Sequence, residues 1–148
     1  MEPTSRKSKK IVFKPAHGCI FMLQGLKVGD SQLLLGSSVD WWLFVYDLTG
    51  EAYSDQPVTT FETANYPVNN ANYCSSNNSL VCGTVGGAVY LFSNFSKCYF
   101  KDYKVYQSCP EPVYDKFAVC SFWQNDSLWS INFPLNVYKW DPVRHPES

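Results

Sequence analysis

Charged side chains are scarce in this chain. They make up 17% of its 148 residues, and the formal net charge is −1. In globular domains about a quarter of all residues are usually charged. A chain this close to neutral lacks the basic surface that nucleic acid or an anionic membrane requires, so we expect neither as a partner. No apolar run approaches the ~18 residues needed to span a bilayer.

Histidine is also rare, and the cysteines are dispersed. The chain has two histidines, His17 and His145, and its six cysteines include no CxxC pair. A zinc site needs closely spaced cysteine and histidine ligands, so we expect no metal and no cofactor. The glycine-rich stretch at 83–87 lacks the spacing of a phosphate-binding loop. A cysteine nucleophile needs a positioned base; only His17 lies near one, and we interpret it as structural. We therefore predict that the protein is not an enzyme.

The six cysteines and three Asn-x-Ser triplets would suit a secreted, disulfide-bonded glycoprotein. The first ten residues, MEPTSRKSKK, are polar and basic, with no apolar segment after them, unlike a secretory signal. We therefore predict reduced thiols and a cytoplasmic or nuclear location. Secretion is the alternative if the chain derives from a longer precursor. Residues 1–9 and 143–148 are predicted to be disordered tails.

Aromatic residues are abundant, at 17%, and apolar and polar residues alternate along most of the chain. This pattern predicts an all-β fold. Three segments share one pattern: a short apolar strand, a small residue, a tight turn, and a second strand that ends in an aromatic residue. The segments are Leu33–Asp47, Ser79–Ser93 and Asp126–Asp141, with Gly36, Gly83 and Ser130 as small residues and Tyr46, Phe92 and Trp140 as aromatic ends. The aromatic ends are 46 and 48 residues apart, a period typical of repeat-built β proteins.

Further strands are expected around each hairpin. They lie upstream at Cys19–Leu26, Ala71–Ser75 and Phe117–Trp123, and downstream at Val58–Glu62 and Tyr99–Tyr106. The predicted domain, residues 10–142, therefore holds three units of four antiparallel strands. The third unit lacks its last strand, and we predict that Ile11–Lys14 completes it.

These motifs resemble the WD-repeat family of β-propellers and, equally, the propeller repeats of quinone-dependent enzymes. Trp140-Asp141 matches the dipeptide of the first family, and "GGAVYLF" and "VYDLTGE" match the Val-Tyr and Thr-Gly pattern of the second. The resemblance implies a partial propeller of three blades. In WD repeats a His, a Ser or Thr, an Asp and the Trp are hydrogen-bonded in series. The candidates for this network here are His17, Ser37, Asp40 and Tyr46. A β-sandwich is the alternative fold.

The propeller resemblance implies a non-enzymatic scaffold that binds a protein or peptide partner through turns on one face. The candidate contact residues are Trp41, Gly86, Gly87, Phe133 and Pro134. Alternative functions are a secreted, disulfide-bonded β-sandwich binding protein, or the propeller segment of a larger enzyme. Three blades leave open edges, which favour pairing with another chain. We therefore also predict a homodimer that closes a six-blade ring.

Overall fold

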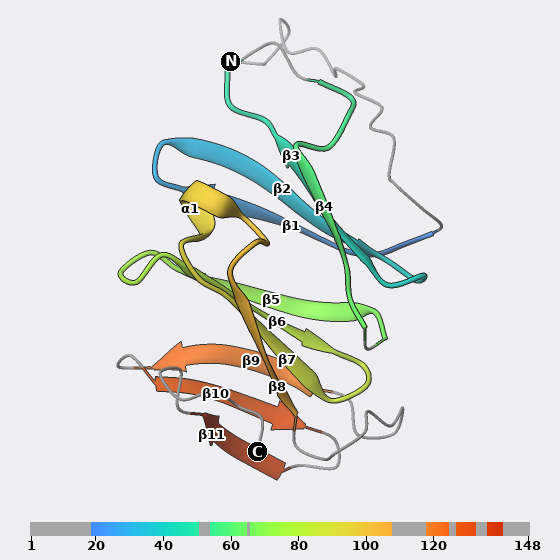
Figure 1. Cartoon of the computed structure of the whole chain (residues 1–148), viewed down its shortest axis with the longest axis vertical. Helices are drawn as coiled ribbons and strands as arrows, with labels where there is room; N and C mark the ends of the chain where they lie inside the picture. Colours follow the sequence, from blue (N-terminus) through green and yellow to red (C-terminus); the bar gives the residue numbers. More distant parts are fainter. Residues whose placement is uncertain are drawn as a thin grey trace, which may run out of the picture.

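The computed structural model describes residues 19–50, 54–64, 66–107, 118–124, 127–132 and 136–140. Within these ranges the chain forms antiparallel strands and one short helix, which confirms the all-β fold. The strands build three sheets that follow one another along the long axis of the molecule in sequence order (Figure 1). The predicted tails and the predicted closing strand Ile11–Lys14 lie outside the described residues.

Each sheet is a meander in which consecutive strands are neighbours. Sheet A contains β1 (Ile20–Val28), β2 (Ser31–Ser38), β3 (Trp42–Asp47) and β4 (Thr59–Glu62). Sheet B contains β5 (Val68–Cys74), β6 (Ser79–Thr84), β7 (Ala88–Phe92) and β8 (Tyr103–Gln107). Sheet C contains β9 (Ala118–Gln124), β10 (Ser127–Asn132) and β11 (Asn136–Trp140). The strands predicted upstream and downstream of the hairpins are thus confirmed within a few residues.

The central hairpins of the three sheets share one register. In each, a leucine lies directly opposite the aromatic residue that ends the second strand. The pairs are Leu34 with Tyr46, Leu80 with Phe92, and Leu128 with Trp140. The leucines repeat at the same intervals of 46 and 48 residues as the aromatic residues. The repeat therefore holds in the strand pairing as well as in the sequence.

The register corrects one predicted equivalence. Gly36, Cys82 and Ser130 each pair with the residue two positions before the terminal aromatic. Gly83 pairs one step further from that aromatic, so its predicted equivalence to Gly36 is wrong by one residue. Both Cys82 and Gly83 are small, and only the cross-strand pairing distinguishes them, because a shift by one residue moves a side chain to the other face.

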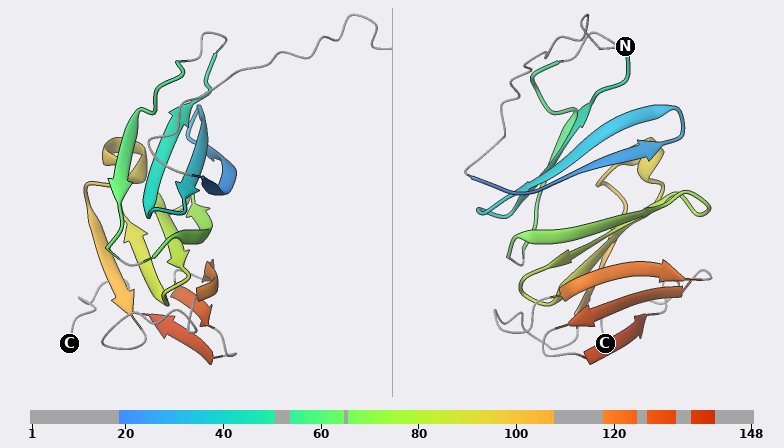
Figure 2. Two further views of the ribbon diagram at one scale, coloured as in Figure 1. Left: turned by 90° about the vertical axis from the view of Figure 1, so that its right-hand side faces the viewer. Right: turned by 180° about the vertical axis from the view of Figure 1, so that it is seen from behind.

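Sheet B lies between the other two sheets (Figure 2), and both of its faces are buried. Leu80 and Phe92 point into the core shared with sheet A, whereas Val81 and Leu91 point into the core shared with sheet C. Every residue of β6 and β7 is buried as a result. This explains why "LVCGTVGGAVYLF" has no charged residue and alternates so little between apolar and polar: neither face is in contact with water.

One element was not expected from the sequence. Between β7 and β8 the chain forms the short helix α1 (Phe95–Cys98), so the predicted strand Tyr99–Tyr106 is correct only from Tyr103 onward. Asn78 anchors the helix start: its carbonyl accepts from the Phe95 amide at 3.0 Å, and its Oδ1 accepts from the Ser96 amide at 3.0 Å. Phe95 is fully buried and fixes the helix on the core.

Candidate functional site

The turn between β2 and β3 is organised by Ser38. Its carbonyl accepts from the Trp41 amide at 3.1 Å, and its hydroxyl accepts from the Trp42 amide at 3.3 Å. The same hydroxyl donates to Oδ1 of Asp40, which lies in the turn. Trp41 has a φ of +79°. A three-residue hairpin turn whose last residue is left-handed is common, and glycine is the usual residue at that position.

The turn between β6 and β7 shares the two bonds that Ser38 accepts from backbone amides, with Thr84 in the place of Ser38. The Thr84 carbonyl accepts from the Gly87 amide at 3.2 Å, and its Oγ1 accepts from the Ala88 amide at 3.1 Å. Gly87 occupies the position of Trp41, and its φ is +93°. Both turns therefore have a left-handed residue at their last position. This residue is tryptophan in sheet A and glycine in sheet B.

The left-handed conformation costs a residue with a Cβ roughly 1–2 kcal/mol. Trp41 adopts this conformation with 38% of its surface exposed, and the rest of its side chain packs against neighbours that include Tyr66. Strained residues persist where the surroundings fix them, and they cluster at binding sites. The geometry of the turn favours glycine, so it does not by itself explain a tryptophan here.

Tyr66 connects the two turns. Its ring centroid lies 5.7 Å from that of Trp41, with the planes tilted by 57°. On its other side the ring covers Gly86: a Cβ added there would lie 2.1 Å from Cδ2 of Tyr66. Tyr66 itself has a φ of +55°. Two adjacent aromatic residues therefore both adopt left-handed conformations. We refer to Asp40, Trp41, Tyr66, Gly86 and Gly87 as the turn-end site.

Thr63 forms hydrogen bonds with the backbone carbonyls of Trp41 and Tyr66. It is buried, and its amide donates to the Trp41 carbonyl at 2.8 Å. Its Oγ1 lies 3.1 Å from the Trp41 carbonyl and 3.0 Å from the Tyr66 carbonyl, so its single proton can serve either. Next to it, the Ala64 amide donates to the Tyr90 hydroxyl at 3.0 Å. Thr63 and Ala64 therefore connect the link between sheets A and B to the Trp41 backbone and to the buried Tyr90.

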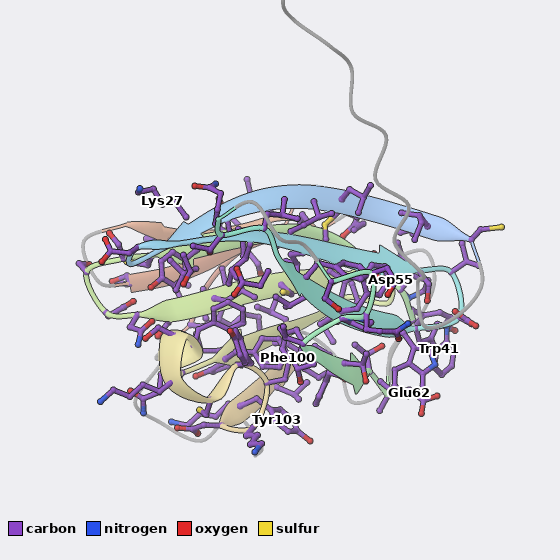
Figure 3. All side chains as sticks on the ribbon, turned by 90° about the horizontal axis from the view of Figure 1, so that it is seen from above. Lys27, Trp41, Asp55, Glu62, Phe100 and Tyr103 are labelled. Carbon is purple, nitrogen blue, oxygen red and sulfur yellow. The ribbon has the colours of Figure 1, made fainter. Side chains whose placement is uncertain are left out.

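The surface around Trp41 is apolar and acidic. Ile20 and Val39 are 42% and 46% exposed, and the Val39 amide pairs with the neighbouring strand at Cys19. Two exposed carboxylates, those of Asp40 and Glu62, lie close to Trp41 in the turn and in the strand partner of Trp42. Figure 3 shows Trp41 and Glu62 on the same side of the molecule, away from Lys27. The arrangement is an aromatic anchor with apolar neighbours and negative charge.

Three of the five predicted contact residues, Trp41, Gly86 and Gly87, gather at this end. Phe133 and Pro134 lie outside the described residues. The sequence reasoning missed Tyr66. It lies in the link between two sheets and carries no motif, and its contact with both turns arises only from the packing of sheet A on sheet B. Its single local signal is an aromatic residue directly before a proline.

Only three members of the predicted hydrogen-bond series, Ser37, Asp40 and Tyr46, can be described, because His17 lies outside the described residues. Ser37 is buried, and its hydroxyl donates to the Val68 carbonyl at 2.7 Å, which joins sheet A to sheet B. Asp40 accepts from Ser38, the neighbour of the predicted residue. Tyr46 is buried, and burial, followed by the nearby Asp55 carboxylate, raises the pKa of its hydroxyl. The series through all four residues stays a prediction.

In sheet C the indole N–H of Trp140 donates to the Ser130 hydroxyl at 2.9 Å. This bond was not predicted from the sequence. The signal was present, since Ser130 lies two residues from the strand partner of Trp140. The equivalent positions in sheets A and B hold Gly36 and Cys82, so neither sheet can form the same bond.

The four cysteines whose side chains are described, Cys19, Cys74, Cys82 and Cys98, are free thiols. Burial raises the pKa of Cys82, so its thiol stays protonated and packs as a small apolar side chain. The described residues include no group of three or more potential metal ligands. They also include no helix that is long and apolar enough to cross a membrane.

A scan against protein-family models and a search of the curated proteins each found no match to this chain.

Proposed function

We propose that this chain is a non-enzymatic β-repeat scaffold of the propeller type, and that it binds a peptide segment of a partner protein at the turn-end site. One observation carries the proposal. Trp41 occupies a turn position that suits glycine, its ring is exposed, and Tyr66 supports it from the next sheet. The absence of enzymatic activity and the cytoplasmic or nuclear location stay predictions.

The propeller-type architecture is supported by the common plan of the three sheets. Two are four-stranded meanders and the described part of the third is a three-stranded one, all with the same register in the central hairpin. The first strands contact one another in succession, β1 with β5 and β5 with β9. Inner strands of neighbouring blades lie in this way around a propeller axis, and equivalent turns then gather at one end.

Peptide binding is supported by the chemistry of the site. Tryptophan and tyrosine are the side chains that contribute most to protein interfaces, because each buries a large rigid ring at a small entropic cost. The ring of Trp41 is held by Tyr66, and both backbones are held by Thr63, so little ordering is needed on binding. The carboxylates of Asp40 and Glu62 favour a peptide in which a basic residue lies next to an apolar one.

The test is selection of peptides of about twelve residues from a random displayed library on the full chain. A selected peptide is then synthesised and titrated calorimetrically against the wild type and Trp41→Gly. Because the variant keeps the turn and loses the anchor, we expect its dissociation constant to rise at least about 30-fold, a hot-spot effect of about 2 kcal/mol.

The matched control is Val58→Ala, which shortens a side chain that is 48% exposed next to β4. We expect its affinity to stay within about twofold of the wild type. Glu62→Gln should weaken binding a few-fold at low salt and less at high salt, because exposed charges are screened. Equal affinity of the wild type and Trp41→Gly for every selected peptide would contradict the proposal.

A further inference from the structure

The two faces of each sheet are distinct, and they are used in a fixed order. One face carries the leucine and the terminal aromatic of the central hairpin; we call it the leucine–aromatic face and the other one the reverse face. In sheet B the leucine–aromatic face packs on sheet A, and in sheet C, through Leu128 and Trp140, it packs on sheet B. The reverse faces of sheets A and B supply the other side of these two cores.

Both contacts within the chain therefore join a reverse face to the leucine–aromatic face of the next sheet. This order leaves one face of each kind without a sheet against it. The leucine–aromatic face of sheet A has no preceding sheet among the described residues, and the reverse face of sheet C has no following one. The two remaining faces are of the kinds that pair twice within the chain.

On the leucine–aromatic face of sheet A, the side chains next to the strands already pack against one another. Phe44 lies over Gly36, where an added Cβ would come within 2.3 Å of its ring and 3.0 Å of Leu23. Phe44 meets Tyr46 edge to face, with centroids 5.7 Å apart. Above this layer Leu23 is 56% exposed and Phe21 is 45% exposed. The face thus presents apolar side chains on a firm support.

The remaining face of sheet C is also apolar at its centre. Val137 is 60% exposed there, and Trp129 lies on the same face with Nζ of Lys139 5.6 Å from its ring centroid. The indole nitrogen of Trp129 is buried and has no hydrogen-bond partner. Exposed Val137 and the unbonded indole nitrogen of Trp129 distinguish this face from the two interfaces between the described sheets.

We propose that a second copy of this chain covers both faces, with the reverse face of sheet C in each copy packed on the leucine–aromatic face of sheet A in the other. Two such contacts arise by two-fold symmetry, and six sheets then close into a ring. The contact continues the order of faces within the chain, and six lies within the usual range of about four to eight blades. The inference does not depend on the peptide site at the turn end.

The test uses light scattering on the full chain with two substitutions, one on each face. Leu23→Asp alters the face of sheet A and Val137→Asp alters the face of sheet C. In a head-to-tail pair each substitution places a carboxylate in both contacts, so we expect each to raise the dimer dissociation constant about 100-fold or more. Val39→Asp, at an exposed apolar residue in the β2–β3 turn and outside the strands, should leave the wild-type dimer unchanged.

Mixing the two variants distinguishes the arrangement. A mixed pair has one contact with both substitutions and one with neither, so an equimolar mixture should form more dimer than either variant alone. If the dimer instead formed between the sheet A faces of both copies, Val137→Asp would leave the dimer dissociation constant unchanged. That result, a monomeric wild type, or open-ended growth with concentration would each overturn the six-sheet ring. Phe21→Asp replaces Leu23→Asp if circular dichroism shows that the latter unfolds.

Discussion

The β2–β3 and β6–β7 turns share two hydrogen bonds from backbone amides, and each has a left-handed residue before its second strand, but that residue is Trp41 in one and Gly87 in the other. Gly87 adopts the conformation freely, whereas Trp41 adopts it under strain. The adjacent position differs as well: Gly86 lies under the ring of Tyr66, while its equivalent Asp40 is exposed. The Tyr66 ring covers the β6–β7 turn, whereas the β2–β3 turn exposes the side chains of Asp40 and Trp41.

The largest expected effect is at the covered turn. Gly86→Ala would place a Cβ 2.1 Å from a ring carbon of Tyr66 and force that ring, together with its contact to Trp41, to move. We expect a loss of about 2–3 kcal/mol in the free energy of unfolding, measured by denaturant titration at a fixed protein concentration. The matched change Asp40→Ala introduces no clash and loses the bond from the Ser38 hydroxyl, so it should cost only about 1 kcal/mol. Equal costs would remove the distinction between the turns.

The next effect tests the strain itself. Gly87→Trp would give the β6–β7 turn the residue found in the β2–β3 turn, at a φ of +93°. We expect the free energy of unfolding to fall by about 1–2 kcal/mol, since the new Cβ meets the left-handed penalty. A stable Gly87→Trp variant would mean that this turn tolerates any residue at its last position, and Trp41 would then need no special explanation.

A smaller effect is expected where the two turns are held together. Thr63→Val keeps the shape of the side chain and removes the hydroxyl near the carbonyls of Trp41 and Tyr66. The Trp41 carbonyl keeps its bond from the Thr63 amide, so we expect a loss of only about 1 kcal/mol in stability. The same variant should also weaken binding of a selected peptide, whereas Thr60→Val, on the exposed strand surface nearby, should change neither quantity.

Much of the architecture was predictable because it is local. The alternation of apolar residues indicated the strands, and the spacing from Tyr46 to Phe92 to Trp140 indicated the repeat, which the register confirms. The helix α1 was not predictable in the same way. Its four residues have too little helical periodicity to recognise, and it is fixed by Asn78 and by the burial of Phe95.

The candidate site divides in the same manner. The sequence places Trp41, Gly86 and Gly87 in turns, and equivalent turns of repeated hairpins must lie at one end of the sheets. It does not place Tyr66 between them, because that contact depends on how sheet A packs on sheet B. Nor does it indicate that Trp41 has a positive φ; only an alignment by register shows that it stands where the next unit has glycine.

The smallest expected effect is the most informative about this difference. Trp41→Gly and Trp41→Ala both remove the ring and its contact with Tyr66, so the comparison between them isolates the backbone. Glycine avoids the left-handed penalty of roughly 1–2 kcal/mol and adds about 0.4–1 kcal/mol of unfolded-chain entropy. We therefore expect the glycine variant to be the more stable of the two, by about 0.5–1 kcal/mol in denaturant titration.

The control is the same pair of substitutions at Val58, an exposed residue that is not among those with a positive φ. There glycine should be the less stable variant by about 0.5–1 kcal/mol, as it is at ordinary extended positions. Opposite signs at the two positions would establish that the β2–β3 turn prefers glycine and holds tryptophan at a cost. The same sign at both would mean that Trp41 is unstrained, and the argument that its ring is there for a partner would lose its foundation.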